Sequence, residues 1–312
     1  MRVLFAGTPE IAVPSLDAIA ASGHTLAGVL TAPDRRKGRG KTVSFSPVKE
    51  RALELGVPVV QPERLRTEAR EEIGPIHPEV LACFAYGKLF GPRFLELFPV
   101  AALNVHPSLL PQYRGPAPIP AAILAGDRRT GVTIQDVALE MDAGDILAQA
   151  TIPLSGTETT ATLSDTAARV GAELLVDVLD RLAAGTAVRT PQNHAAATYT
   201  SLVEKTDGLI DWSDSAAHIE RMVRAYTPWP HAYTGFGGER LAILEAAVAP
   251  GSSLEPVPGR VARVDTSLGI LVETGNGLLA LRRLQLQSRK PLDWKSFLNG
   301  VHDFHEAVLG GP

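Results

Sequence analysis

Residues 103–115 read LNVHPSLLPQYRG, an apolar strand pattern that runs directly into a proline-rich turn. Successive side chains of a strand point to opposite faces, so Asn104 and His106 share one face and can reach the same small object. Pro107 cannot donate a hydrogen bond to a neighbouring strand, which predicts that the strand ends at His106. Because ligands bind at such strand ends in open parallel sheets, this stretch predicts a reaction centre.

An asparagine and a histidine at a strand end can also serve only to satisfy a turn, as polar loop side chains commonly do. Asp142, within EMDAGD at residues 140–145, favours the reaction centre. A carboxylate beside an imidazole fixes its tautomer and raises its pKa, which suits a histidine that acts as a charged hydrogen-bond donor. We therefore predict that Asp142 meets His106 in the fold.

The length of 312 residues favours two domains with a substantial core. No apolar run is long enough to span a membrane. The first residues, MRVLFAG, enter a strand pattern without a secretion signal, so we expect a cytoplasmic protein.

Cys83 is the one cysteine, which excludes an internal disulfide and a cysteine-rich metal site. The sequence has no HExxH pattern either, and we expect no metal.

Alternating strand and helix patterns predict an α/β first domain with a Rossmann-like, open, mostly parallel sheet. Thr8 and Pro9 predict the start of the first helix, with Thr8 as its N-terminal cap. Only one glycine of the GxGxxG fingerprint follows the first strand, which argues against a nicotinamide dinucleotide site. A long helical pattern at residues 162–184 closes this domain, which we assign to residues 1–188.

A polar, turn-rich stretch predicts a linker at residues 189–207, before a second domain at residues 208–312. Short apolar segments separated by glycine, proline and asparagine predict a small antiparallel β-barrel, similar to the oligonucleotide-binding (OB) fold. These segments lie at residues 241–248, 259–264, 269–274 and 278–284. We expect Trp212 and Trp229 to anchor the core or an interface rather than to form a binding platform.

Positive charge is concentrated in the run RRKGRGK at residues 35–41, which has five cations in seven positions. Such a run is commonly only a solvated loop, although a glycine-broken cationic loop also suits contact with phosphates. The whole chain has 30 basic and 34 acidic residues, a net charge of −4, so any attraction for a polyanion must be local. The segment from residue 205 onward, with 11 basic and 12 acidic residues, is not strongly basic.

The motif NVHPSLLP at residues 104–111, followed by MDAGD at residues 141–145, resembles the folate-dependent formyltransferases. The similarity extends nearly end to end and is strongest to the branch that formylates initiator methionyl-tRNA. It implies 10-formyltetrahydrofolate as the formyl donor, no resident metal and a monomer. It also implies that the folate is held by Tyr86, Gly87, Lys88, Ser108, Leu109, Leu110 and Pro111.

The resemblance further implies how the acceptor tRNA is bound. The basic run matches a family insertion that reaches the acceptor end, and the C-terminal domain is expected to be a second tRNA-binding part. The expected tRNA contacts are Arg35, Arg36, Lys37, Arg39 and Lys41.

Formyl transfer requires a neutral amine to attack the formyl carbon, and stabilising the resulting oxyanion is the main catalytic task. We assign Asn104 and a protonated His106 as donors to this oxyanion, with Asp142 holding His106 charged and passing protons. A covalent enzyme intermediate is the weaker alternative, because Cys83 has no obvious histidine partner and Ser108 lacks the GxSxG elbow.

Two other functions are consistent with parts of the sequence. A sugar amine, a purine-pathway amine or water could accept the formyl group, but a small acceptor needs neither the basic run nor the barrel-like domain. A non-catalytic RNA-binding protein could have kept the fold, but it would not need Asn104, His106 and Asp142.

Overall fold

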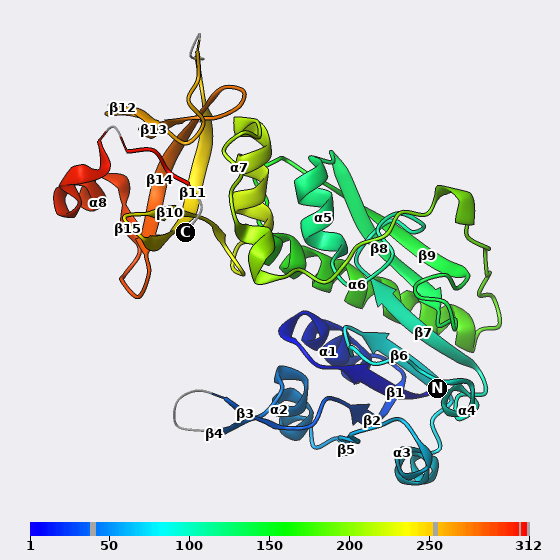
Figure 1. Ribbon diagram of the computed structural model, residues 1–312. Coiled ribbons are helices and arrows are strands. Elements are labelled where there is room, and N and C mark those ends of the chain that lie inside the picture. The colour runs from blue at the N-terminus through cyan, green and yellow to red at the C-terminus, as the bar shows by residue number, and fades with distance from the viewer. Residues whose placement is uncertain (38–41, 252–254, 306, 311–312) are drawn as a thin grey trace. The chain divides into compact units, whose positions relative to one another are not determined.

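The computed structural model describes residues 1–37, 42–251, 255–305 and 307–310 (Figure 1). The chain forms two compact units. The first takes residues 1–118, 129–153 and 164–200, and the second takes residues 119–128, 154–163 and 201–312. The predicted linker at residues 189–207 is thus divided between the two units. No helix in the described parts of the chain is long and apolar enough to cross a membrane.

The first unit is built on a seven-stranded sheet in the order β5-β2-β1-β6-β7-β8-β9. The first five strands in this order are mutually parallel, whereas β8 and β9 are antiparallel to their neighbours. This arrangement confirms the predicted open, mostly parallel sheet. The strands are β1 (Arg2–Gly7), β2 (Thr25–Leu30), β5 (Val59–Val60), β6 (Val80–Phe84), β7 (Ala101–His106), β8 (Arg129–Asp136) and β9 (Ile146–Pro153).

Central strands of this sheet are buried along almost their whole length. Every residue of β6 is buried, and β1 exposes only its first residue. Strands covered on both faces read as continuous apolar runs, which is why these segments lack an alternating pattern. The accompanying helices are α1 (Val13–Ala21), α2 (Pro47–Glu54), α3 (Thr67–Ile73), α4 (Pro92–Leu95) and α6 (Thr160–Ala183), whose first four residues are assigned to the second unit.

Thr8 does not cap the first helix, contrary to the sequence-based expectation. A 3-10 turn at Glu10–Ala12 comes first, and no side chain caps it. The Thr8 hydroxyl instead donates to the carbonyl of Tyr86 at 3.5 Å and accepts from the amide of Ala32 at 3.4 Å. These residues follow β1, β6 and β2, so Thr8 ties together the carboxyl ends of three neighbouring strands.

The second unit contains a six-stranded antiparallel sheet in the order β10-β11-β14-β13-β12, with β15 paired to β14. Near the C-terminus, Gly310 pairs with Gly235 in β10, and Val308 pairs with Arg260, just before β12. One segment therefore joins the two ends of the sheet, as a small closed barrel requires. The strands are β10 (Ala232–Phe236), β11 (Glu239–Ala249), β12 (Val261–Asp265), β13 (Gly269–Glu273), β14 (Leu278–Leu286) and β15 (Leu292–Asp293).

Helices α5 (Pro118–Ala125, from residue 119 onward), α7 (Ala216–Ala225) and α8 (Trp294–Gly300) complete the second unit. Trp212 lies in its core, 4% exposed, and its indole N–H donates to the Thr234 hydroxyl at 3.1 Å. This confirms the predicted anchoring role of Trp212, whose one polar atom has found a buried partner.

The position of Gly131 in β8 leaves no room for a side chain. A Cβ there would lie 2.2 Å from the carbonyl oxygen of Ala150 and 2.5 Å from a methyl carbon of Leu109. We expect Gly131→Ala to lower the free energy of unfolding by about 1–3 kcal/mol, since neighbouring backbone must move. Urea unfolding measures this, and Gly23→Ala, where a Cβ meets nothing within 4 Å, is the matched control. Equal stability of the two variants would contradict the packing of β8 and β9.

Candidate active site

Asn104 and His106 lie at the carboxyl end of β7, and Asp142 lies in the loop between β8 and β9. One carboxylate oxygen of Asp142, Oδ1, accepts from the Asn104 amide nitrogen at 3.3 Å. The other, Oδ2, lies 3.6 Å from Nδ1 of His106. The structure therefore brings together the three residues that the sequence singled out.

Asp142 has two further donors that the sequence did not indicate. The backbone N–H of Gly115 donates to Oδ2 at 2.8 Å, and the side-chain amide of Gln135 donates to Oδ1 at 3.0 Å. Gly115 has φ +108°, and a Cβ there would lie 2.6 Å from the carbonyl oxygen of Thr200. Only glycine fits this backbone conformation beside Thr200, and this conformation places the Gly115 N–H against the carboxylate.

His106 is 4% exposed, and its Nε2 lies 2.9 Å from the carbonyl oxygen of Tyr113. A carbonyl can only accept, so Nε2 carries the hydrogen. Burial lowers the pKa of His106 more than Asp142 and the Tyr113 carbonyl raise it. This direction favours the neutral ring over the predicted protonated His106, because desolvation outweighs a carboxylate 3.6 Å away. The neutral ring leaves Nδ1 as a proton acceptor facing Asp142.

The loop after β7 is held by its own polar groups. Ser108 is fully buried, and its hydroxyl donates to the carbonyl of Gln112 at 2.6 Å. Thr133 in β8 donates to the carbonyl of Ser108 at 2.7 Å and accepts from the amide of Leu110 at 3.2 Å. The Ser108 hydroxyl and the Leu110 backbone amide thus fix the turn, whereas Leu109 and Pro111 are half-buried and can offer an apolar surface.

The segment after β6 presents backbone rather than side chains. Ala85 and Gly87 are exposed and have positive φ angles of 51° and 81°. The Tyr86 ring between them is buried and stacks on Phe90 with 5.6 Å between ring centres. Lys88 donates to the carbonyl of Pro62 at 2.7 Å. Exposed peptide groups at this strand end can bind the polar edge of a flat heterocycle.

Cys83 is buried within β6, and burial raises the pKa of its thiol to about 12. A thiol that stays protonated is a poor nucleophile, so a covalent intermediate on Cys83 stays the weaker alternative. Among the described residues, no group of three or more His, Cys, Asp or Glu side chains is arranged to hold a metal ion.

The basic run forms part of an antiparallel ribbon of β3 (Arg35–Lys37) and β4 (Thr42–Ser44). Arg35 is exposed, Arg36 and Lys37 belong to β3, and the predicted tRNA contacts Arg39 and Lys41 lie outside the described residues. At the base of the ribbon, Asp34 pairs with Lys49 at 2.5 Å and accepts from Gln61 at 2.9 Å. These contacts fix where the ribbon leaves the first unit.

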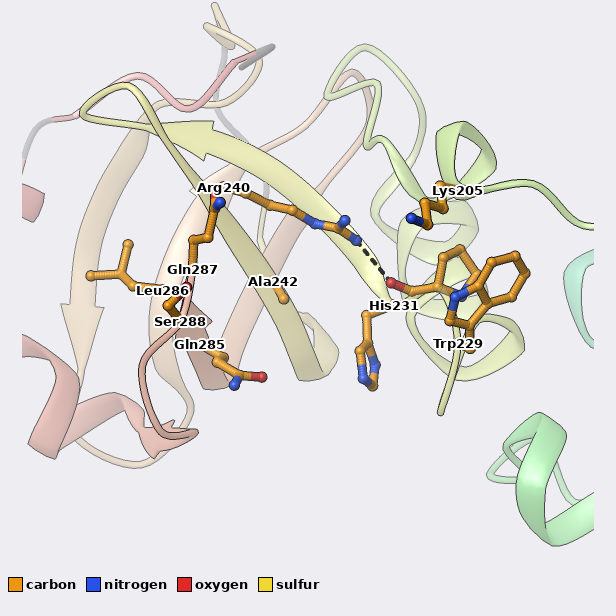
Figure 2. A pocket seen from close by; sticks show the side chains of 10 residues that line it. Lys205, Trp229, His231, Arg240, Ala242, Gln285, Leu286, Gln287 and Ser288 are labelled. Carbon is orange, nitrogen blue, oxygen red and sulfur yellow. Dashed lines mark hydrogen bonds between the residues drawn. The ribbon is translucent and has the colours of Figure 1, made fainter. Parts of the chain in front are cut away.

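A cavity of about 310 Å³ lies in the second unit (Figure 2). Trp229 lines it and is 52% exposed, so it does not lie in the core, whereas its predicted alternative role as an interface anchor stays a prediction. Arg240, another lining residue, donates to the carbonyl of Pro230 at 2.8 Å and lies 3.7 Å from the centre of the Tyr233 ring. With Lys205 also in the lining, the cavity combines an open aromatic face with two cations.

Comparison with known proteins places the whole chain in one family. The Formyl transferase family matches residues 1–179, and its C-terminal domain family matches residues 202–302. Methionyl-tRNA formyltransferase from Treponema denticola is 46% identical over 318 residues, which cover 98% of each chain. Methionyl-tRNA formyltransferase from Chloroflexus aggregans is 46% identical over 303 residues, which cover 97% of this chain and 98% of that one.

A solved structure shows the same fold at low identity. The N-formyltransferase from Helicobacter canadensis, in complex with folinic acid and dTDP-3-aminofucose, superposes with a TM-score of 0.67 at 17% identity. The match covers 91% of this chain and 99% of that one. This match shows the fold, and the full-length relatives confirm the resemblance seen in the sequence motifs. The chain belongs to the methionyl-tRNA formyltransferase family.

Proposed function

We propose that Asn104, His106 and Asp142 catalyse transfer of a formyl group from 10-formyltetrahydrofolate to the amino group of methionine on initiator tRNA. Methionyl-tRNA formyltransferase activity follows from the close full-length relatives. The observation that supports these residues is their convergence at the carboxyl end of β7, where parallel sheets bind ligands. The donor, the initiator tRNA and the individual roles below are part of the proposal.

The two strand ends beside this centre suit a folate. The backbone of residues 85–88 offers peptide groups to the polar edge of the pterin, and Leu109 and Pro111 offer apolar surface to its aryl part. The folinic acid bound by the Helicobacter canadensis relative supports a folate donor. When bound, the donor would supply the formyl group.

The reaction places negative charge on the formyl oxygen and removes a proton from the attacking amine. Asn104 has a side-chain N–H donor for that oxygen, which is the contribution that matters most in such transfers. His106 is neutral, so its Nδ1 can accept the proton of the amine, and Asp142 stabilises the resulting imidazolium. His106 then returns the proton to the leaving nitrogen, and no net proton is gained or lost.

Two surfaces of the protein are candidates for binding the tRNA. The cationic ribbon of β3 and β4 suits phosphates, and an exposed arginine such as Arg35 can contact them without desolvation of a buried charge. In the second unit, the open face of Trp229 beside Lys205 and Arg240 suits an unpaired base and its phosphate (Figure 2). Both surfaces are positive on a chain whose net charge is −4.

Transfer of labelled formyl from 10-formyltetrahydrofolate tests this function directly. We expect label on methionyl initiator tRNA and much less on methionyl elongator tRNA or on small amines. Label released as formate, or carried by a small amine, would leave the catalytic residues in place but overturn the proposed acceptor.

Removal of the proposed oxyanion donor, Asn104, or of the proposed proton acceptor, His106, should lower turnover more than it weakens binding of methionyl-tRNA. We expect Asn104→Ala to lower kcat roughly 10²- to 10³-fold, as loss of an oxyanion donor does, and His106→Ala roughly 10²- to 10⁴-fold. The Kd for methionyl-tRNA, measured by filter binding, should stay nearly the same. An active His106→Ala variant would remove the mechanism.

The pH dependence of kcat should report the neutral His106. Its pKa is lowered by burial, so activity should fall on the acid side, below the usual histidine pKa of 6.5, as Nδ1 becomes protonated. Asp142 raises this pKa, so Asp142→Asn should lower it further and move the acid limb of the residual activity to lower pH. A limb that moves to higher pH would contradict the assignment.

Arg39 is the residue of the basic run whose replacement we would test first. We expect Arg39→Ala to weaken use of methionyl-tRNA and to reduce its salt dependence, because one phosphate contact is lost. Binding of the folate should be unchanged. Arg169→Ala, at an exposed position of α6, is the control. An equal loss at low and high salt would argue against phosphate contact.

A further inference from the structure

We infer that Gln192 is a positioning residue for Asp142. It is the second member of a directed chain of hydrogen bonds that runs from Arg114 to Gln192, then to Gln135, and ends on the Asp142 carboxylate. This inference rests on the proposed catalytic role of Asp142. Gln192 lies in the segment after α6, 50 residues from Asp142 in the sequence, and is 6% exposed. No sequence motif singled it out.

The chain begins at Arg114, whose side chain is completely buried. Its Nη2 and Nε donate to the side-chain oxygen of Gln192 at 2.8 Å and 3.2 Å. A guanidinium is a donor only, so it selects which end of the Gln192 amide faces it. The nitrogen of that amide must therefore face the opposite way, toward the Asp142 loop.

The two hydrogens of the Gln192 amide nitrogen are directed at three oxygen atoms, so one hydrogen is shared between two of them. The nitrogen lies 2.7 Å from the carbonyl of Gly144, 2.9 Å from the carbonyl of Asp142 and 3.2 Å from the side-chain oxygen of Gln135. The two carbonyls flank the turn in which Asp142 adopts φ +53°, a conformation that non-glycine residues seldom hold without support. Gln192 thus supports the backbone on which the carboxylate is mounted.

The same contact orients Gln135. Since Gln192 donates to the Gln135 oxygen, the Gln135 nitrogen faces Asp142 and donates to Oδ1 at 3.0 Å. Each amide in the series is therefore turned by the donor before it, and the series ends on the proposed catalytic carboxylate. Reversal of one amide would place an oxygen against an oxygen at the next step.

The isosteric variant Gln192→Glu tests this arrangement in the full-length protein. A glutamate still accepts from Arg114 and keeps the side-chain volume, but it cannot donate to the three oxygens. We expect kcat to fall roughly 10- to 100-fold, as for loss of a partner that orients a reacting group, with little change in KM for methionyl-tRNA. A uniform loss of binding without loss of kcat would overturn the inference.

Asn193→Asp is the matched control, because it makes the same amide-to-carboxylate change one residue later. Asn193 is exposed, and its Oδ1 accepts from the Ala195 amide, which an aspartate also allows. Its kcat should equal that of the unchanged protein. A loss of similar size in Asn193→Asp would show that added negative charge alone explains the effect, and would overturn the inference.

A double-mutant cycle separates a positioning role from general destabilisation. In an Asp142→Asn background, Gln192→Glu should cause no further loss of kcat, because residues that act as a unit are not additive. A full, independent loss would mean that Gln192 acts elsewhere. Urea unfolding shows whether Gln192→Glu is folded. If it is not, Gln135→Glu provides the same test at the last step of the chain.

The cycle also separates this inference from the proposed function. Full activity of Asp142→Asn alone would overturn the catalytic role of Asp142, and the inference with it. An inactive Asp142→Asn beside a fully active, folded Gln192→Glu would overturn only the role of Gln192.

Discussion

The arrangement of the candidate site in the first unit depends on the hydrogen bonds that the Asp142 carboxylate accepts. The carboxylate accepts hydrogen bonds from a strand residue, Asn104, from a neighbouring strand, Gln135, and from the backbone of Gly115. These partners come from three separate segments, so the carboxylate fixes their spacing as much as they fix its orientation. A group with this many fixed donors needs little reorganisation during a reaction, which is the basis of electrostatic preorganisation.

Burial of His106 is the second feature on which the candidate site depends, because it decides the direction of the shift in the pKa of the ring. The ring loses its contact with water, and its pKa falls although a carboxylate lies 3.6 Å away. A permanently charged histidine at this place would be poorly suited to accept a proton from an amine. A neutral ring is ready to accept one under the same conditions in which the attacking amine is neutral. Desolvation therefore suits His106 to the proposed proton transfer.

The sequence predicted those parts of the candidate site that depend on the spacing of residues within one strand. It did not predict those that depend on the register in which two strands pair. The spacing of Asn104 and His106 in one strand, and the proline that follows, predicted their common face and the strand end correctly. Gln135 reaches Asp142 only because β8 pairs with β7 so that Gln135 lies opposite Asn104. Nothing in the local pattern of β8 fixes that register. The apolar character of Trp229 allowed a place in the core, and only the fold shows that about half of this residue is exposed.

The segment after α6, which was predicted to begin a linker, supports the loops that carry the candidate site. Thr190 pairs with Ile146 in β9, and the backbone of Arg114 binds Thr198 and Thr200 at 2.8 Å each. This segment thus adds pairing to the loops that carry both sides of the candidate site. A polar, turn-rich sequence was predicted to be a linker because such stretches rarely bury apolar surface. Here it is held by backbone hydrogen bonds and by buried amides, which need no apolar pattern. The loops of the candidate site are therefore ordered by a part of the chain whose composition alone gives no sign of that role.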